Sequence, residues 1–314
     1  MRRLVTLLIS LAIIGVILWK IDRADLAHRF RHLDGFFFSL ALACFVPQTL
    51  VAAKRWQVLL RGSCDVSLWS ATRVILASST LNVILPSKLG DMAKPYFHSR
   101  RGELKTGVGL VLVVIEKLLD VGTLSVFVLL GILSLRERDL KVLACGAAAS
   151  LALILVAFLF LGEPRTRGIY RLLTGRVPSR LTPWIEGFWA DWEKVLSGLK
   201  ATRGRFSSIQ ALSLLLWLLH LIQIYLFFLT LKHPVPILLV YALVPPAIFI
   251  GLLPISFAGI GTRDSALIYL FAPYASASLM AGVGILTSVR YVVPALFGLP
   301  FFHDYMAPSN PQDR

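Results

Sequence analysis

Long stretches without a single charged side chain dominate the hydrophobic pattern of this sequence. Four of them, 21 to 30 residues in length, cover residues 142–162, 206–231, 233–262 and 265–289. A helix needs about 20 apolar residues to cross the hydrocarbon core of a bilayer. Because 16% of all residues are charged, stretches of this length are not expected in a water-soluble protein. The pattern predicts an all-α polytopic membrane protein.

The apolar segments predict seven or eight membrane-spanning helices. Residues 4–19 follow Arg2 and Arg3 as in a signal peptide, but no small-x-small cleavage site precedes Lys20, so we interpret them as an uncleaved first span. We expect residues 1–314 to form a single transmembrane domain. The expected spans are 4–19, 35–53, 107–135, 142–162, 209–231, 235–253 and 276–302, with shorter apolar pieces at 74–86 and 264–273.

Two of the apolar segments are interrupted, at residues 85–91 and 253–264. Each interruption contains Leu-Pro, then Ser, then Gly and a basic residue in either order, then Asp. Similar interrupted segments in the two halves of a chain are typical of transporters built from repeats, whose site lies near the middle of the membrane. We therefore expect two broken or re-entrant helix pairs that meet in space, an arrangement compatible with an inverted repeat.

The distribution of Lys and Arg predicts the orientation. If 74–86 is re-entrant and the N-terminus is inside, the inside segments carry 20 basic residues and the outside segments carry eight. Basic residues accumulate on the cytoplasmic side of membrane proteins. The count predicts a multi-pass protein of the cell (inner) membrane with a cytoplasmic N-terminus.

Residues 163–208 form the one sizeable polar segment and carry nine Lys or Arg. Four aromatic residues in it share one face of a helix. We expect a cytoplasmic amphipathic connector that either lies at the membrane interface or packs on the ends of neighbouring spans. The aromatic residues are Trp184, Phe188, Trp189 and Trp192.

The net charge of +15 does not indicate nucleic-acid binding, because the basic residues lie in short loops between apolar segments and not on one continuous face. The three cysteines, Cys44, Cys64 and Cys145, form no CxxC pair and have no metal-ligand spacing relative to the six histidines. We expect no disulfide framework, no metal site and no cofactor.

The two breaks carry residues suited to an anion. Glycines let the backbone approach a ligand closely, and a helix that restarts at Asp91 or Asp264 presents free N–H groups. Lys or Arg beside such a helix start would complete a phosphate site. Alternatively, Asp91 and Asp264 cap their helices, while Lys88 and Arg263 pair with buried carboxylates. The expected substrate-binding residues are Lys88, Gly90, Asp91, Lys94, Ser256, Gly259, Gly261 and Arg263.

Three charged residues, Glu116, Lys117 and Asp120, interrupt the apolar stretch 107–135, and Arg290 stands alone in the last one. Glu116 and Asp120 share one helix face, whereas Lys117 points about 100° away from Glu116. Charges within a span are costly and face the bundle interior with a partner. Either carboxylate titrates during transport or both are static counter-ions, and the second interpretation is favoured. The expected partners are Lys88, Lys94, Arg263 and Arg290.

The order of these motifs resembles the lysylphosphatidylglycerol synthase transmembrane-region family, over residues 4–302. The resemblance implies a lipid-flippase-like membrane domain: the same module precedes the synthase domain of multiple peptide resistance factors, and stand-alone relatives accompany hopanoid, glycolipid or polyprenyl-phosphate pathways. Where the family usually has Glu after the last motif's arginine, this sequence has Asp264. The motifs are Lys54-Arg55-Trp56-x-x-Leu59-Leu60, Asn82-x-x-Leu85-Pro86-Ser87-Lys88-x-Gly90-Asp91, Glu116-Lys117-x-x-Asp120 and Pro254-x-Ser256-x-x-Gly259-x-Gly261-x-Arg263.

We expect a stand-alone member without the aminoacyl-transferase domain, because the chain ends at Arg314, soon after its last apolar stretch. Its expected function is a lipid translocase, or flippase, for a phosphate-bearing or glycosylated lipid, and without a Walker motif it would not be driven by ATP. Its partners would be an anionic or glycosylated membrane lipid and the membrane, and a homo-oligomer is compatible with this interpretation.

The alternative function is an integral-membrane transferase that acts on a lipid-linked head group. One of Glu116, Asp120 and Asp91 would then act as general base. The sequence has no Asp-x-Asp metal pair, no cluster of His with carboxylates and no nucleotide-binding loop. This poverty of catalytic groups favours a transporter over an enzyme.

Overall fold

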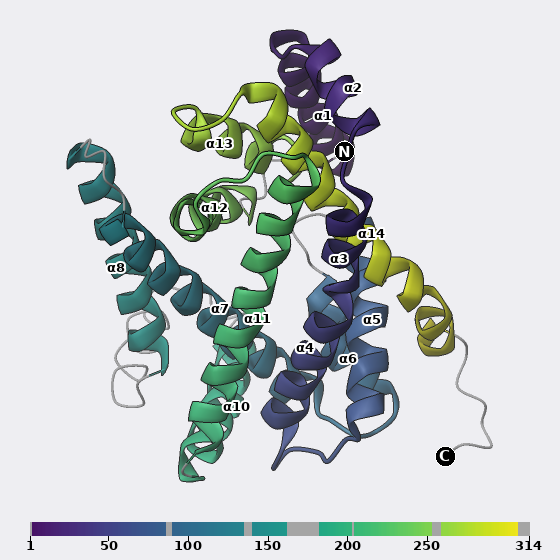
Figure 1. Cartoon of the computed structure of the whole chain (residues 1–314). Coiled ribbons are helices and arrows are strands. Elements are labelled where there is room, and N and C mark those ends of the chain that lie inside the picture. Colours follow the sequence, from purple (N-terminus) through teal and green to yellow (C-terminus); the bar gives the residue numbers. More distant parts are fainter. Residues whose placement is uncertain are drawn as a thin grey trace.

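The computed structural model describes residues 2–85, 90–134, 140–161, 182–202, 204–252 and 259–306. No strand occurs among these residues, so the all-α class is confirmed. The helices are α1 (Arg2–Lys20), α2 (Arg23–Arg31), α3 (Gly35–Ala43), α4 (Phe45–Leu60), α5 (Leu68–Ile84), α6 (Ala93–Arg100), α7 (Thr106–Ser134), α8 (Leu140–Leu161), α10 (Thr182–Ala201), α11 (Arg205–Thr230), α12 (Ile237–Leu252), α13 (Thr262–Phe271) and α14 (Ala277–Met306) (Figure 1).

Three apolar helical segments in the described part of the chain are long enough to cross a membrane on their own: Gly35–Leu60, Arg205–Thr230 and Ala277–Phe302. The first consists of α3 and α4, which continue into each other because Cys44 between them keeps helical dihedral angles. This helix reaches seven residues beyond the expected end of the span at residue 53. The extension brings Arg55 into the helix.

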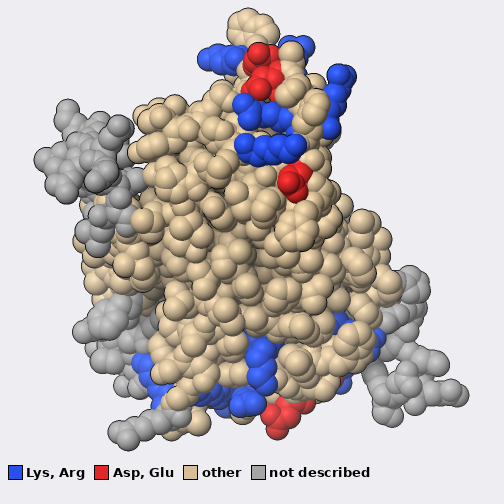
Figure 2. All heavy atoms as spheres, viewed as in Figure 1, with Lys and Arg blue, Asp and Glu red and all other residues tan. Residues whose placement is uncertain are grey.

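On the face shown in Figure 2, the surface between the two ends of the molecule is almost free of charged side chains. Figure 2 shows Lys and Arg gathered at the two ends of the view and an uncharged belt between them. Large apolar side chains are exposed on several helices, a pattern expected where a protein faces lipid rather than water. Examples are Leu130 on α7, Leu151 and Leu155 on α8, Leu214 on α11, and Leu296 and Phe297 on α14.

Glycines let the long helices pack closely. A Cβ atom at Gly298 of α14 would lie 2.0 Å from the carbonyl oxygen of Leu76 on α5, and one at Gly131 of α7 would lie 2.2 Å from Cα of Ala242 on α12. Such distances leave no room for a side chain. Small residues at crossings are typical of membrane helices, because close van der Waals packing drives their association.

The two interrupted segments occupy opposite halves of the molecule. In Figure 1, α5 and α6 lie in the lower half, and α12 and α13 lie in the upper half. Residues 86–89 and 253–258, which include Lys88 and Ser256, lie outside the described residues. The first interruption therefore lies between α5 and α6, and the second lies between α12 and the start of α13, so each falls between consecutive helices, as expected.

The glycines at the interruptions allow two parts of the backbone to lie in close contact. A Cβ at Gly90 would lie 2.5 Å from the backbone nitrogen of Asn82, and one at Gly259 would lie 2.6 Å from the carbonyl oxygen of Gly251. Gly259 and Gly261 also have φ values of +75° and +94°, which side-chain-bearing residues rarely adopt. The close approach expected at these glycines is made to neighbouring parts of the chain.

The connector helix α10 packs against α7 and α11 at the lower end of the molecule (Figure 1). Trp192 and Trp189 are buried, with 1% and 8% of their surface exposed, whereas Trp184 is 65% exposed. Packing on neighbouring helices therefore accounts for the inner part of the aromatic face. Residues 163–181 and 203 of the expected connector lie outside the described residues.

Candidate functional site

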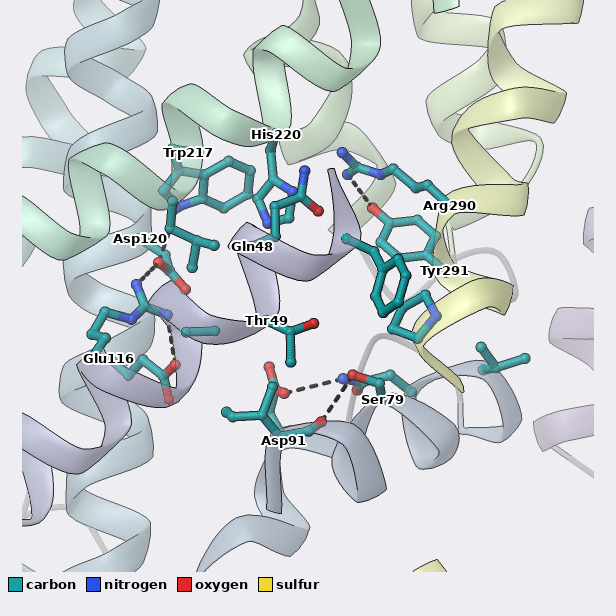
Figure 3. Close-up of a pocket in the computed structure, with 18 of the residues that line it drawn as sticks. Gln48, Thr49, Ser79, Asp91, Glu116, Asp120, Trp217, His220, Arg290 and Tyr291 are labelled. Carbon is teal, nitrogen blue, oxygen red and sulfur yellow. Dashed lines mark hydrogen bonds and ion pairs between the residues drawn. The ribbon is translucent and has the colours of Figure 1, made fainter. Parts of the chain in front are cut away.

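A cavity of about 300 Å³ lies between α4, α5, α7, α11 and α14 (Figure 3). Asn82, which precedes the first interruption, and Asp91, its last residue, line the cavity together with Ile260 of the second interruption. The two interrupted segments therefore contribute to one cavity. The cavity is mostly apolar, with charged side chains in its wall.

Six charged side chains in the cavity wall form a closed ring in which cations and carboxylates alternate. α4 provides one member, α7 provides three, and the segment that follows the first interruption provides two. The contacts around the ring are Arg55–Glu116 (2.6 Å), Glu116–Lys94 (2.9 Å), Lys94–Asp91 (3.6 Å), Asp91–Lys117, Lys117–Asp120 (3.7 Å) and Asp120–Arg55 (2.6 Å).

Hydrogen bonds with uncharged side chains complete this charge ring. Trp217 of α11 donates from Nε1 to Asp120 at 3.0 Å, and Asn82 donates from Nδ2 to Asp91 at 3.1 Å. The Arg55 guanidinium also donates to the hydroxyl of Ser213 at 3.1 Å. Each carboxylate of the ring thus contacts at least two cations or donors, as buried charges require.

The expected partner Lys94 does pair with Glu116, but Asp120 pairs with Arg55 and Lys117, which were not among the expected partners. Lys117 was expected to point away from Glu116; its flexible four-carbon side chain reaches Asp91 and Asp120 instead. The signal for Arg55 was available in the sequence: Lys54 and Arg55 follow the apolar stretch 35–53 and could belong to its helix.

Arg263 is held by its own neighbour and is not among the residues that line the cavity. Its Nε and Nη2 atoms donate to Oδ1 of Asp264, at 2.9 and 2.6 Å, and Nη2 also reaches the hydroxyl of Ser288 at 2.9 Å. Oδ2 of Asp264 accepts the N–H of Gly261 at 3.0 Å and so caps α13. Both residues therefore follow the alternative expectation from the sequence. Asp264 caps its helix, and Arg263 pairs with a buried carboxylate, which is that of Asp264 itself.

Arg290 lies on the opposite side of the cavity from Glu116 and Asp120 (Figure 3). The residue is 5% exposed, and its Nη2 donates to the hydroxyl of Tyr291 at 2.7 Å. Nε and Nη1 are buried and have no hydrogen-bond partner in the described part of the chain. None of the described carboxylates lies within 4.0 Å of this guanidinium.

The charges of the cavity wall do not balance. Among the described residues, four basic side chains and three carboxylates line the cavity, and the charge ring pairs three of each. Arg290 is therefore a surplus cation in apolar surroundings. In Figure 3 its side chain extends from α14 toward Gln48 and His220, which also line the cavity. A buried cation with unused donors is a binding site for an anion.

This fold, with its uncharged belt and internal charged cavity, defines a polytopic helical membrane protein. Its sequence matches the family model described as lysylphosphatidylglycerol synthase TM region over residues 3–298, and the chain belongs to that family. The resemblance found in the motifs is thereby confirmed. No curated protein matches the chain. The family is a membrane domain associated with lipid chemistry, in agreement with a lipid-related function in the membrane.

Proposed function

We propose that the protein is a lipid translocase, which moves a lipid with a phosphate-bearing or glycosylated head group across the membrane without ATP. The observation that carries the proposal is Arg290: a buried guanidinium with unused donors in a cavity enclosed by apolar helices. A lipid phosphate would supply the missing counter-charge, and its acyl chains would extend into the surrounding bilayer. Charged groups inside a span typically mark a substrate pathway.

The alternative transferase needs a carboxylate that is free to accept a proton. Each of the three cavity carboxylates, Asp91, Glu116 and Asp120, is engaged by two cations of the ring. A carboxylate held by two cations is a poor base. This geometry favours transport over chemistry on the head group.

The proposal includes an arrangement in the membrane. The protein would reside in the inner membrane with its N-terminus and residues 163–208 in the cytoplasm, and α5–α6 and α12–α13 would be re-entrant pairs that enter from opposite sides. The opposite placement of these pairs in the fold supports an inverted arrangement (Figure 1). Non-helical backbone at membrane depth must line a cavity or be buried in protein, and residues next to both interruptions line this one.

The proposed substrate site combines expected residues with new ones. Arg290 would bind the phosphate, and the ring residues Asp91 and Lys94 would form the opposite wall. Gly90, Gly259, Gly261 and Arg263 would hold that wall and α14 in position, while Lys88 and Ser256, also expected from the sequence, lie outside the described residues.

A translocation assay in liposomes tests the proposal. The purified protein is reconstituted with a fluorescent phosphatidylglycerol, and the fraction of lipid in the outer leaflet is followed by chemical quenching, without nucleotide. We expect exchange between leaflets well above that of empty liposomes, and an Arg290→Gln rate at least about tenfold lower. Arg61→Gln, which removes an exposed arginine at the end of α4, is the control and should stay within about twofold of the wild type.

Two results would reject the translocase. One is a wild-type rate equal to that of empty liposomes at several protein-to-lipid ratios. The other is chemical conversion of the fluorescent lipid, detected by mass spectrometry of the extracted lipids, which would favour the transferase.

A further inference from the structure

The charge balance of the cavity specifies which head group it accepts. We propose, building on the translocase function, that the cavity selects lipids whose head group carries one net negative charge on a phosphodiester and no cationic group. The proposal follows from the juxtaposition of a self-contained charge ring with a single surplus guanidinium across the same cavity.

The ring cannot serve as a second binding partner without being dismantled. The contacts from Arg55 to Glu116 and from Arg55 to Asp120 are both 2.6 Å long, and both carboxylates are buried. Releasing one of these charges to a ligand would leave its partner unpaired in apolar surroundings, which is strongly unfavourable. Among the described residues, the ligand therefore meets one available charge, that of Arg290.

One negative charge on the ligand makes the occupied cavity neutral. A phosphodiester has a single negative charge and two oxygen atoms that accept hydrogen bonds, and the Arg290 Nε and Nη1 atoms together offer three N–H bonds without an acceptor. The match concerns both charge and hydrogen bonding. An uncharged apolar ligand would leave the donors unsatisfied.

Other head groups leave a charge uncompensated. A phosphomonoester, whose second pKa is near 6, carries close to two negative charges at alkaline pH, and the second would have no cation to pair with. A choline head group adds a quaternary ammonium close to Arg290, although all three carboxylates of the cavity are already engaged. Burial of an unpaired charge disfavours both classes.

The uncharged polar residues of the wall suit a hydroxylated head group. Gln48, Thr49 and Ser79 line the cavity with amide and hydroxyl groups, and Trp217 adds an aromatic surface. At about 300 Å³ the cavity is at the lower end of the range for small-molecule sites. It has room for a head group, so the acyl chains of a bound lipid must lie outside it.

Competition between lipids in one membrane tests the selection. The full chain is placed in nanodiscs that contain equal amounts of phosphatidylglycerol, phosphatidylcholine and phosphatidic acid with the same acyl chains, at pH 8.5. Lipids that remain bound are identified by native mass spectrometry for the wild type, Arg290→Gln and Arg290→Lys. Arg61→Gln again controls for loss of a positive charge at the surface.

We expect the wild type and Arg61→Gln to retain phosphatidylglycerol at least about tenfold over each of the other two lipids. Arg290→Gln should reduce this preference to less than about twofold, and Arg290→Lys should keep most of the preference over phosphatidylcholine. Equal retention of the three lipids by the wild type, or an unchanged preference in Arg290→Gln, overturns the proposal. A melting curve of each variant shows that it is folded, so loss of the preference is not read from an unfolded protein.

A soluble probe distinguishes a lipid site from a site for a free anion. Deacylated phosphatidylglycerol has the same charge and head group but no acyl chains. We expect it to compete with the lipid only at concentrations at least about 100-fold higher, and equal competition overturns a lipid site. If phosphatidylcholine crosses the membrane as fast as phosphatidylglycerol, the proposed selectivity is wrong but the proposed translocase function stands. If no lipid is translocated, the function itself is rejected.

Discussion

Arg290 donates a hydrogen bond to the hydroxyl of Tyr291, its neighbour along α14, over 2.7 Å. The guanidinium also lies over the Tyr291 ring, 4.7 Å from its centroid. Tyr291 is thus the residue that holds the surplus cation of the cavity in position. The hydroxyl makes one contact and the ring makes the other, so a substitution that removes only the hydroxyl separates the two.

Tyr291→Phe removes the acceptor and keeps the ring. One more donor of a buried guanidinium is then unsatisfied, and we expect a loss of stability of about 1–3 kcal/mol in lipid-free detergent. Addition of phosphatidylglycerol should recover part of the loss, because the phosphate accepts the freed N–H. The measurement is the melting temperature with and without lipid. Tyr269→Phe on α13, where the side chain is 78% exposed, should melt like the wild type, and so would Tyr291→Phe if its hydroxyl had no such role.

Glu116→Gln opens the charge ring. Glu116 is 1% exposed and pairs with both Arg55 and Lys94, so its neutralisation leaves two buried cations short of a partner. We expect a loss of about 3–5 kcal/mol of stability. Unfolding of the purified protein in detergent gives the difference from the wild type. The matched control, Glu186→Gln on the exposed side of α10, should change stability by less than about 0.5 kcal/mol.

Arg263→Ala tests whether this arginine is structural. Its removal strands the buried Asp264 carboxylate, and we expect a destabilisation of about 3–5 kcal/mol rather than a selective loss of lipid binding. Replacing both residues in Arg263→Ala/Asp264→Ala should recover part of the stability, because no charge is then unpaired. If Arg263→Ala instead kept the stability of the wild type and lost its bound lipid, the arginine would belong to the substrate site.

Cysteine labelling tests the orientation. Ser197 lies exposed on α10 and Arg31 lies exposed on α2, at opposite ends of the molecule (Figure 1). In a background without the three native cysteines, a membrane-impermeant maleimide added to intact cells should label Arg31→Cys and not Ser197→Cys. Labelling after cell lysis shows that both thiols are reactive. The reverse pattern in intact cells would invert the orientation.

Hydropathy was enough to predict long apolar helices such as α11 and α14, because a membrane span is a local property of about 20 residues. It ended the second span at residue 53, since Lys54 and Arg55 look like the start of a loop, whereas α4 continues to Leu60. Arg55 can stay in the helix only because Glu116 and Asp120, more than 60 residues away in the sequence, neutralise it.

The candidate site was also predictable only in part, because its local features are visible in the sequence but its long-range contacts are not. The charges of α7 and the glycines of the interruptions stand out in the sequence, but the identity of their partners depends on how distant helices pack. Asp264 follows Arg263 directly, whereas Arg290 has no charged neighbour in the sequence, but the sequence alone does not show whether Asp264 pairs with Arg263. The structure separates them: the adjacent carboxylate satisfies Arg263, while among the described residues Arg290 donates a hydrogen bond to the Tyr291 side chain alone.

The charge ring also determines which parts of the protein are able to move. It ties α4, α7 and the start of α6 together, and drawing any one of them away would strand charges at a cost of several kcal/mol. Ile260, Ser288 and Arg290 lie on the other side of the cavity. Among the described residues, no ion pair joins the ring to Arg290, the charged residue of that side. A gate for a lipid would therefore open along this second side, with the ring-bearing helices moving as one rigid body.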